Sequence, residues 1–428
     1  MTYQDALAIL LGLERFGVQP GLERIEALLD ALDHPESRLS ILHVGGTNGK
    51  GSTSAMLASM LEAAGLRVGS YTSPHLLAFP ERIRVDGRPV AETTVARWVE
   101  RLQPLLEKVH PTFFEATTAL ALAAFAEAPV EVAVLEVGMG GRWDATTVGR
   151  PFVSILTPIS YDHQAYLGAT LSEIATEKAA IIRTGPAVVA AQEPEVMRII
   201  EARVRSTGLP LLRVGRELHV DVRENTLEGQ IVDLAGPGWR YERCALPLLG
   251  LFQPGNALLA VAALHASGLS VSEAAVRLGL ARVSWPGRFQ LIQRRPALLL
   301  DGAHNPTGAQ ALASSLRHYF PRESVTLVVG ISRDKDLGGI LKVLAPLARR
   351  MILTAARNPR AATPGELQAH FPAFDGEVAL ASTPTDALET AFKRPDEVTV
   401  VTGSLFLVAD ALAWSEKTLG PSNWGMLR

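Results

Sequence analysis

Short apolar runs alternate with helical patterns along the first half of the chain, and several of these runs end in glycine. Four runs predict buried strands: 39–44, 67–72, 130–137 and 152–157. The small and apolar residues of Gly51–Ala64 predict a helix, and Gly65 supplies its C-terminal stop. Alternating buried strands and helices are typical of a doubly wound, mostly parallel sheet, which binds ligands beyond the carboxyl ends of its strands.

The pattern changes between residues 209 and 249. Polar and apolar residues alternate along Leu218–Val222, and turn signals follow at Glu224-Asn225 and at 236–238. We therefore expect a small antiparallel excursion attached to the first sheet. Helical patterns resume at 255–266 and 271–280.

The segment Ser284–Arg288 contains two helix breakers, Pro286 and Gly287, and predicts a domain boundary. A second round of alternation follows it, with strands expected at 297–300, 324–329, 350–354 and 397–401 and helices at 306–317, at 337–348 and from 405. We predict an N-terminal domain of residues 1–287 and a smaller, Rossmann-like α/β domain of residues 288–428.

The composition narrows the protein class. The 428 residues suffice for two or three domains, and 41 Lys and Arg against 44 Asp and Glu leave a net charge of −3. There is no general basic field for nucleic acid or an anionic membrane, and one cysteine, Cys244, excludes an internal disulfide framework. No signal-peptide pattern begins the chain, and no apolar run reaches the ~18–20 residues that span a bilayer. We expect a soluble, cytoplasmic protein without nucleic-acid or membrane partners.

The glycine turn Gly45–Ser52 carries the most specific chemical signal. A helix start offers free N–H groups and partial positive charge to phosphate, Lys50 can reach the outer phosphates, and Ser52 can offer a hydroxyl to Mg²⁺. The strict GxxxxGK[ST] pattern is not met, because Val44 takes the place of the first glycine and Gly51 separates Lys50 from Ser52. The turn predicts a P-loop-type nucleotide site; a glycine turn without a ligand is the alternative.

Two polar residues stand at the ends of predicted strands. Glu136 lies in an apolar run, and a buried carboxylate needs a cation or a donor. We favour a Mg²⁺ ligand, with a salt bridge to Arg142 as the alternative. His163 follows the strand 152–157, and a ligand role and a structural role stay equally open.

Lys178 shares one helical face with Leu171, Ile174, Ala175 and Ile181, so it lies in the apolar stripe. A lysine that snorkels from the edge of the stripe is favoured by the sequence alone. A desolvated lysine with a lowered pKa, open to covalent modification, is the alternative.

The second domain opens with a strand that ends in Asp301, followed by His304 and by Pro306 at a helix start. These ionisable groups predict a site that faces the interdomain cleft. A helix cap with a spare histidine is equally compatible with the pattern. Asp334–Asp336 and Thr402–Ser404 also follow strands and carry weaker signals.

Together these segments resemble the folylpolyglutamate synthase/dihydrofolate synthase family, relatives of the Mur ligases, in order over nearly the whole chain. The matching segments are Gly46–Ser52, Thr72–Leu76, Glu81–Ile83, Phe114–Thr118, Leu135–Gly138, Gly141-Arg142, Asp144–Thr146, Asp162-His163, Ile174-Ala175, Glu177–Ala179, Pro286–Phe289, Leu300–Pro306, Asp334–Asp336 and Thr402–Leu405. Phe252 departs from the family's histidine, Ala180 from its glycine and Thr147 from its frequent asparagine.

The resemblance implies an ATP-dependent ligase that joins L-glutamate to a folate-type carboxylate, either dihydropteroate or a reduced folate, through an acyl phosphate. It assigns ATP to the N-terminal domain and glutamate ligation to the C-terminal domain. It also implies two Mg²⁺, with a monovalent cation as a further candidate, and we expect a monomer. A Mur-type ligase for a UDP-muramyl acceptor and a P-loop nucleotide switch without ligation remain the alternatives.

The resemblance also assigns roles to individual residues. The implied ATP contacts are Gly46, Thr47, Asn48, Gly49, Lys50, Gly51, Ser52, Asn256, Arg288 and Asp301. The implied metal ligands are Ser52, Ser73, Glu136 and His163. The implied catalytic residues are Lys50, a carbamylated Lys178, Asp301 and His304. The implied substrate contacts are Ser73, Pro74, His75, Arg82, Glu115, Thr118, Asp144, His304 and Ser404.

Overall fold

The first sheet has eight strands in the order β4-β3-β2-β5-β1-β6-β7-β8. Its strands are β1 (Ser40–Gly45), β2 (Val68–Tyr71), β3 (Ile83–Val85), β4 (Arg88–Pro89), β5 (Val132–Glu136), β6 (Pro151–Leu156), β7 (Ala187–Val189) and β8 (Leu211–Arg213). The computed structural model describes residues 1–371 and 373–420. The neighbouring strands β2, β5, β1, β6, β7 and β8 run parallel to one another. The strands β3 and β4 form an antiparallel edge beside β2.

Helices cover both faces of this sheet, because side chains of the central strands alternate between two apolar cores. Leu42 and Val44 of β1 pack with α3 (Lys50–Ala63), α9 (Gln253–Ser267) and α10 (Glu273–Arg282). Helices on the other face are α1 (Tyr3–Gly12), α2 (Glu23–Asp30), α4 (Glu92–Val109), α5 (Phe113–Glu127), α7 (Leu171–Ala179) and α8 (Pro194–Thr207). Strands buried on both faces are the reason for the nearly continuous apolar runs in the sequence.

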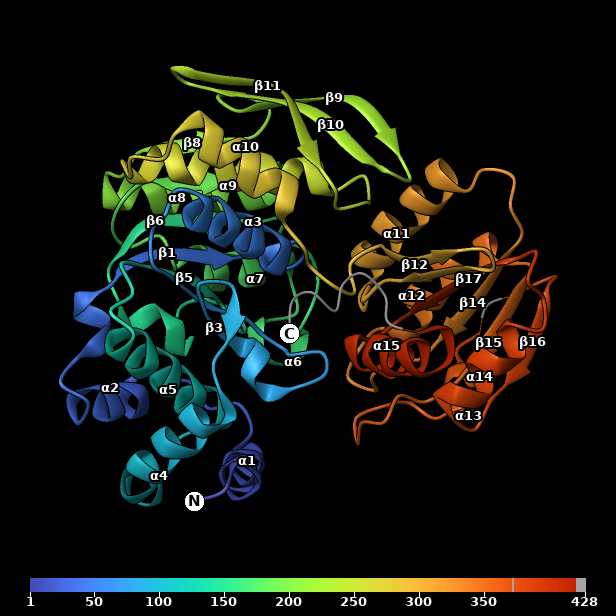
Figure 1. The fold of residues 1–428 in the computed structure, drawn as a ribbon, viewed down its shortest axis with the longest axis horizontal. Coiled ribbons are helices and arrows are strands. Elements are labelled where there is room, and N and C mark those ends of the chain that lie inside the picture. The colour runs from blue at the N-terminus through green and yellow to red at the C-terminus, as the bar shows by residue number, and fades with distance from the viewer. Residues whose placement is uncertain (372, 421–428) are drawn as a thin grey trace.

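A three-stranded antiparallel sheet lies over α9 and α10 (Figure 1). It consists of β9 (His219–Thr226), β10 (Gly229–Gly236) and β11 (Trp239–Leu246). This confirms the antiparallel excursion, but β8 still belongs to the parallel sheet, so the excursion begins later than residue 209. Its far end reaches the second part of the molecule, where Asn225 accepts a hydrogen bond from the Tyr319 hydroxyl.

The second part is a six-stranded sheet in the order β12-β13-β17-β14-β15-β16, beside the first (Figure 1). Its strands are β12 (Gln290–Arg294), β13 (Ala297–Leu300), β14 (Val325–Val329), β15 (Arg350–Leu353), β16 (Glu377–Leu380) and β17 (Val398–Thr402). Its helices are α11 (Pro306–Tyr319), α12 (Leu337–Leu344), α13 (Pro364–Ala369), α14 (Pro384–Ala391) and α15 (Leu405–Leu419). Only β12 runs antiparallel to its neighbour.

The predicted fold class is confirmed: a large, mostly parallel sheet, an antiparallel excursion and a smaller α/β unit. The domain division at 287/288 stays a prediction, and its last residues, 421–428, lie outside the described residues. Among the residues described, no helix combines the length and apolarity needed to span a membrane.

Candidate active site

The loop between β1 and α3 has the geometry of an anion-binding turn. Gly46 and Gly49 have φ values of +127° and +95°, and a Cβ on Gly46 would lie 2.0 Å from Thr157 Oγ1. Thr47 N and Asn48 N donate to Pro158 O at 2.9 and 3.4 Å, which ties the loop to the end of β6. The four amides from Gly49 to Ser52 have no acceptor among the described residues, and the first helical bond is the one that Thr53 N donates to Gly49 O at 3.0 Å. This helix start can therefore receive phosphate.

Lys50 lies over this loop. Its Nζ donates to Gly46 O at 3.4 Å and to Thr47 O at 3.1 Å, and no carboxylate within the described part of the chain pairs with it. The ammonium thus has only carbonyl partners, and its positive charge is available to an anion on the loop.

Gly51, the glycine that breaks the strict motif, has a structural cause. A Cβ at this position would lie 2.7 Å from the Trp285 ring. Trp285 belongs to the linker that precedes β12, and its buried Nε1 has no hydrogen-bond partner in the part of the chain that the structure describes. The extra glycine therefore lets the linker pack against the first turn of the phosphate helix.

Glu136 ends β5 beside the phosphate loop, paired in register with Val44 of β1. Burial raises the pKa of its carboxyl, against the nearby charge of Lys50. Its one hydrogen bond in the described structure comes from Ser73 N at 3.3 Å. The alternative partner was wrong, because Arg142 pairs with Glu177 at 2.9 Å instead.

These oxygen groups fit a divalent cation. Among the described residues, the only side-chain partner of the Ser52 hydroxyl is Gln253 Nε2 at 3.3 Å, and the one hydrogen bond of the buried Glu136 carboxylate comes from Ser73 N. Hydroxyl and carboxylate oxygens are ligands that Mg²⁺ prefers. Among the described residues no three His, Cys, Asp or Glu side chains converge on a metal site, so phosphate and water oxygens would have to complete the shell.

His163 lies just after β6, and burial lowers its pKa to about 4, so its ring is neutral at pH 7. A neutral imidazole has a lone pair for a metal. In this structure its Nε2 lies 3.5 Å from the Nζ of Lys335, which belongs to the loop between β14 and α12 of the second unit.

Lys178 is 3 % exposed, so the snorkelling lysine is wrong and the desolvated lysine is confirmed. Its Nζ donates to Gly46 O of the phosphate loop at 2.9 Å. Burial, followed by the nearby charge of Lys50, lowers its pKa to about 7. A substantial fraction of this amine is therefore unprotonated at neutral pH, which covalent modification requires.

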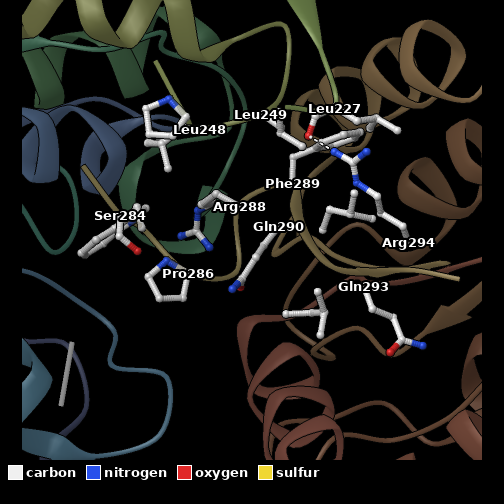
Figure 2. Close-up of a pocket in the computed structure, with 14 residues that line it drawn as sticks. Leu227, Leu248, Leu249, Ser284, Pro286, Arg288, Phe289, Gln290, Gln293 and Arg294 are labelled. Carbon is white, nitrogen blue, oxygen red and sulfur yellow. Dashed lines mark hydrogen bonds between the residues drawn. The ribbon is translucent and has the colours of Figure 1, made fainter. Parts of the chain in front are cut away.

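Asp301 and Arg288 lie together where the second unit begins. Both carboxylate oxygens of Asp301 accept backbone bonds, from Phe289 N at 2.8 Å and from Ala303 N at 2.9 Å. Burial lowers the pKa of Arg288, against the charges of Asp301 and Glu136. Arg288 points into a pocket of about 340 Å³, with Ser284 and Pro286 on one side (Figure 2).

His304 and Asn305 bring the second unit against the first. Asn305 caps α11 through Gly308 N and also exchanges two hydrogen bonds of 3.1 Å with Asn48 of the phosphate loop. His304 Nε2 lies 3.5 Å from Asp162 Oδ2. The motif contains the expected helix cap, but His304 is not a spare histidine, because it approaches Asp162 of the first unit. The site role of Asp301 and His304 stays a prediction.

Asn256 extends the nucleotide side of the site. Its amide donates to Gln253 Oε1 at 3.0 Å, and a Cβ on Gly49 would lie 2.5 Å from Asn256 Oδ1. Gln253 in turn donates to Ser52, so these two α9 side chains connect with the start of α3.

Pro74, His75 and Arg82 are the expected substrate residues that follow Ser73 along the chain. Pro74 is exposed, His75 is half-buried and Arg82 is buried. The Ser73-Pro74 peptide is cis, and Arg82 Nε donates to His75 Nδ1 at 2.8 Å. Burial lowers the pKa of Arg82, whose guanidinium lies 5.1 Å over the Phe113 ring. No carboxylate in the described residues pairs with Arg82 within 4 Å, so its terminal nitrogens can take an anionic substrate.

The remaining expected substrate residues have local structural partners. Glu115 completes the capping box of α5 and pairs with Arg24 at 3.0 Å. Thr118 donates to Phe114 O at 2.8 Å, and Ser404 caps α15. Asp144 accepts bonds from Met139 N and Thr146 N, at 2.9 and 3.0 Å. Their substrate roles stay predictions.

Sequence reasoning gave no individual role to Asp162, Gln253 or Lys335, and it considered Asn305 only as part of a helix cap. Asp162 is the clearest omission, because it contacts residues of the second unit. Burial alone would raise the pKa of its carboxyl, but the hydrogen bond from His304 and the charges of His163, His304 and Lys335 hold that pKa well below its usual range. Its position directly past a strand end was the available signal.

A phosphate loop lies on one α/β unit, and loops with ionisable side chains face it from a second α/β unit. This arrangement is typical of a Mur-type ligase. The Mur ligase middle domain family matches residues 44–264, and the Mur ligase glutamate ligase domain family matches residues 287–405. The chain belongs to the folylpolyglutamate synthase/dihydrofolate synthase family of the Mur ligase superfamily. The predictions of this family and of an ATP-dependent ligase are thereby confirmed.

Relatives match over almost the whole chain. The dihydrofolate synthase/folylpolyglutamate synthase of Bacillus subtilis (strain 168) is 34% identical over 424 residues, which cover 96% of this chain and 98% of that protein. Mycobacterium tuberculosis folylpolyglutamate synthase complexed with ADP and AMPPCP is 38% identical with a TM-score of 0.89, covering 96% and 98% of the two chains. Escherichia coli FolC in complex with DHPP and ADP is 33% identical with a TM-score of 0.87 and the same coverage.

Proposed function

We propose that this ligase joins L-glutamate to the carboxylate of a folate-type acceptor, dihydropteroate or a reduced folate. The observation that carries the proposal is the pairing of Asn48 in the phosphate loop with Asn305 in the second unit, because it sets a phosphate site against Asp301 and His304. The names of the relatives, and the DHPP and ADP complex of Escherichia coli FolC, support this substrate class.

The chemistry requires activation of the acceptor. A carboxylate is a poor acyl donor, since its leaving group would be oxide, whereas an acyl phosphate loses phosphate readily. Transfer of the γ-phosphoryl of ATP to the acceptor gives that acyl phosphate, and the glutamate amine then displaces phosphate. The free amides at the start of α3 and the Lys50 ammonium would stabilise charge on the transferred group.

Two Mg²⁺ belong to the proposal. Ser52, Ser73 and Glu136 would hold one ion, and Glu136 with His163 the second; Mg²⁺ would neutralise the negative charge of the phosphates and carboxylates as they approach. Lys178 would carry a carbamate beside the second ion, since its amine is buried and has a pKa of about 7. A monovalent cation stays a prediction.

The acceptor would lie along the segment from Ser73 to Arg82. The buried Arg82, without a carboxylate partner among the described residues, would bind its carboxylate, and His75 would orient Arg82 through their 2.8 Å hydrogen bond. Closure of the two units around the acyl phosphate would exclude water that could hydrolyse it.

The test compares acceptors in one assay. Purified protein with ATP, Mg²⁺ and glutamate is given dihydropteroate, tetrahydrofolate or a UDP-linked muramyl acceptor, and both ADP and the glutamyl product are measured. We expect ADP and a product that has gained one glutamyl residue with at least one folate-type acid. Turnover with the muramyl acceptor alone, or with none of the three, would overturn the proposed substrate class.

Two variants check the assigned residues. Lys50→Ala should slow ADP release by at least about 100-fold, as loss of a group that stabilises transition-state charge does. Lys178→Ala should be inactive and partly restored by short carboxylic acids such as acetate. Full activity of Lys178→Ala without any added acid would contradict the carbamate.

A further inference from the structure

A single carboxylate of the N-terminal unit collects donors from three residues of the C-terminal unit. Asp162 lies in the loop after β6 and is 8 % exposed. Lys335 Nζ donates to its Oδ1 at 2.6 Å, and Asn305 Nδ2 donates to its Oδ2 at 3.1 Å. His304 Nε2 lies 3.5 Å from the same Oδ2. Residues of the C-terminal unit therefore contact both oxygens of Asp162.

The three donors come from two separate loops. His304 and Asn305 lie between β13 and α11, whereas Lys335 lies between β14 and α12. Asp162 thus joins two loops that the C-terminal sheet presents along one edge. Its own loop is held in turn, because His163 N donates to Oδ1 at 2.8 Å.

The same contacts orient the phosphate side of the site. Asn305 reaches Asp162 with the amide that also pairs with Asn48, so one side chain connects the Asp162 loop, the phosphate loop and the start of α11. Charge-assisted hydrogen bonds from Lys335 and His304 are directional as well as strong in a buried setting. The network therefore specifies one relative placement of the two units.

We propose that Asp162 is a positioning residue of the ligation reaction, which latches the two domains in the closed arrangement through Lys335, His304 and Asn305. Only the expected effect on ligation rests on the proposed function. The latch concerns the placement of the two domains and does not depend on which acceptor is used. Asp162 makes no contact with Lys50, Ser52 or Glu136 that the described structure records. Asn48 has its own two hydrogen bonds to Asn305, so the phosphate loop should keep its ADP affinity when Asp162 is substituted.

The experiment uses Asp162→Asn, which keeps the size of the side chain and removes its charge. Asp233→Asn is the matched control, because Asp233 is equally buried and has a 2.7 Å ion pair with Arg223, but lies wholly within the β9–β11 sheet. Each protein is measured for ADP affinity, for kcat and KM of ligation, and for radius of gyration by small-angle X-ray scattering with ADP present.

We expect Asp162→Asn to retain ADP affinity within about twofold and to have a larger radius of gyration than the parent. Its kcat for ligation should fall about 100-fold, because small displacements of catalytic groups reduce rates by this much. Asp233→Asn should match the parent in all three. Restoration of the compact state and of activity by Asp162→Glu would support a charge-dependent latch.

Equal scattering curves for Asp162→Asn and the parent would overturn the latch, whatever the activity. A loss of ADP affinity parallel to the loss of ligation would also overturn it, because that pattern indicates general damage to the site. If the proposed acceptors are wrong, the parent itself fails in the ligation assay, while the scattering comparison still decides the domain placement.

Discussion

At the scale of single residues, the site contains groups whose burial opposes stability. Lys178 is an ammonium-type side chain with one hydrogen bond to a backbone carbonyl and almost no exposure. Glu136 is a buried carboxylate whose one bond in the described structure comes from a backbone amide. Such groups are expected where function needs a perturbed pKa or an unfilled coordination position.

The first prediction concerns Lys178→Met. Folding lowers the pKa of Lys178 from 10.5 to about 7, so the unfolded state binds more protons than the folded state between these two pH values. The free energy of unfolding therefore rises with pH in this window. The destabilisation caused by Lys178 is greatest below pH 7 and declines as the pH rises toward 10.5. The variant should be inactive, yet at pH 6 its free energy of unfolding should exceed the parent's by roughly 1–3 kcal/mol.

Chemical denaturation at pH 6 and pH 9 measures this difference. The gain from Lys178→Met should shrink at pH 9. Lys108→Met, at an exposed position near the end of α4, serves as the control and should differ little from the parent at either pH. A constant gain at both pH values would contradict the buried ammonium.

The second prediction concerns the glycine that interrupts the phosphate motif. Gly51→Ala places a methyl group 2.7 Å from the Trp285 ring, and overpacking of this kind costs about 1–3 kcal/mol. We expect a lower melting temperature and weaker ADP binding. Gly12→Ala is the control, because a Cβ there would meet no described atom within 4 Å.

A double variant separates the two explanations of that effect. If the clash with the linker is the cause, Gly51→Ala combined with Trp285→Leu should recover part of the lost stability. Equal losses in the single and the double variant would show that Gly51 is needed for another reason.

At the scale of elements, one helix start serves both structure and site. Asn305 caps α11 by accepting from Gly308 N, and with its amide it donates to Asn48 and Asp162. The oxygen and the nitrogen of this side chain therefore perform different tasks, which substitution can separate.

The third prediction uses that separation. Asn305→Asp keeps a good cap but removes both donors and adds a negative charge beside Asp162, so ligation should fall sharply while the helix keeps its cap. Asn305→Ala should also lose about 1 kcal/mol of stability, since the cap is gone. Melting temperatures and ligation rates of the two variants are compared; similar ligation by Asn305→Asp and the parent would contradict the cross-domain role.

The elements also differ in how well their local pattern predicts them. The strand Ala297–Leu300 and the phosphate helix were predicted within a residue, because short apolar runs and a glycine stop are local signals. The helix α5 was missed, since it is buried on nearly all sides and lacks an amphipathic period.

At the scale of the whole molecule, function depends on how two α/β units meet. The linker runs through Gly287, whose φ of +75° suits glycine, and its neighbour Arg288 lies close to carboxylates of both units. In the proposed function, water exclusion and the alignment of the phosphate with the glutamate amine would both depend on this junction.

The fourth prediction follows from that dependence. ATP turnover by the complete enzyme should be slow without an acceptor and should rise when a folate-type acid and glutamate are added together, because closure protects the acyl phosphate. ADP release is measured with each substrate omitted in turn. Rapid ATP hydrolysis with no acceptor present would contradict a site that closes before it reacts.

The sequence by itself determined the features that depend on near neighbours along the chain. The order of strand, glycine turn and helix follows from backbone geometry within a few residues, and the placement of Lys178 in an apolar stripe follows from helical periodicity. The order of the motifs along the chain was sufficient to predict the family. The partner of each polar group could not be predicted from these local patterns.

Only the tertiary structure decided which polar groups meet. Asp162 and Lys335 are 173 positions apart, and Asn48 and Asn305 are 257 apart, so no local pattern records these contacts. The same limit explains why Glu136 was given Arg142 as an alternative partner and why Lys178 was expected to reach solvent. A residue's type and period determine which face it occupies, whereas its partner depends on how distant segments pack.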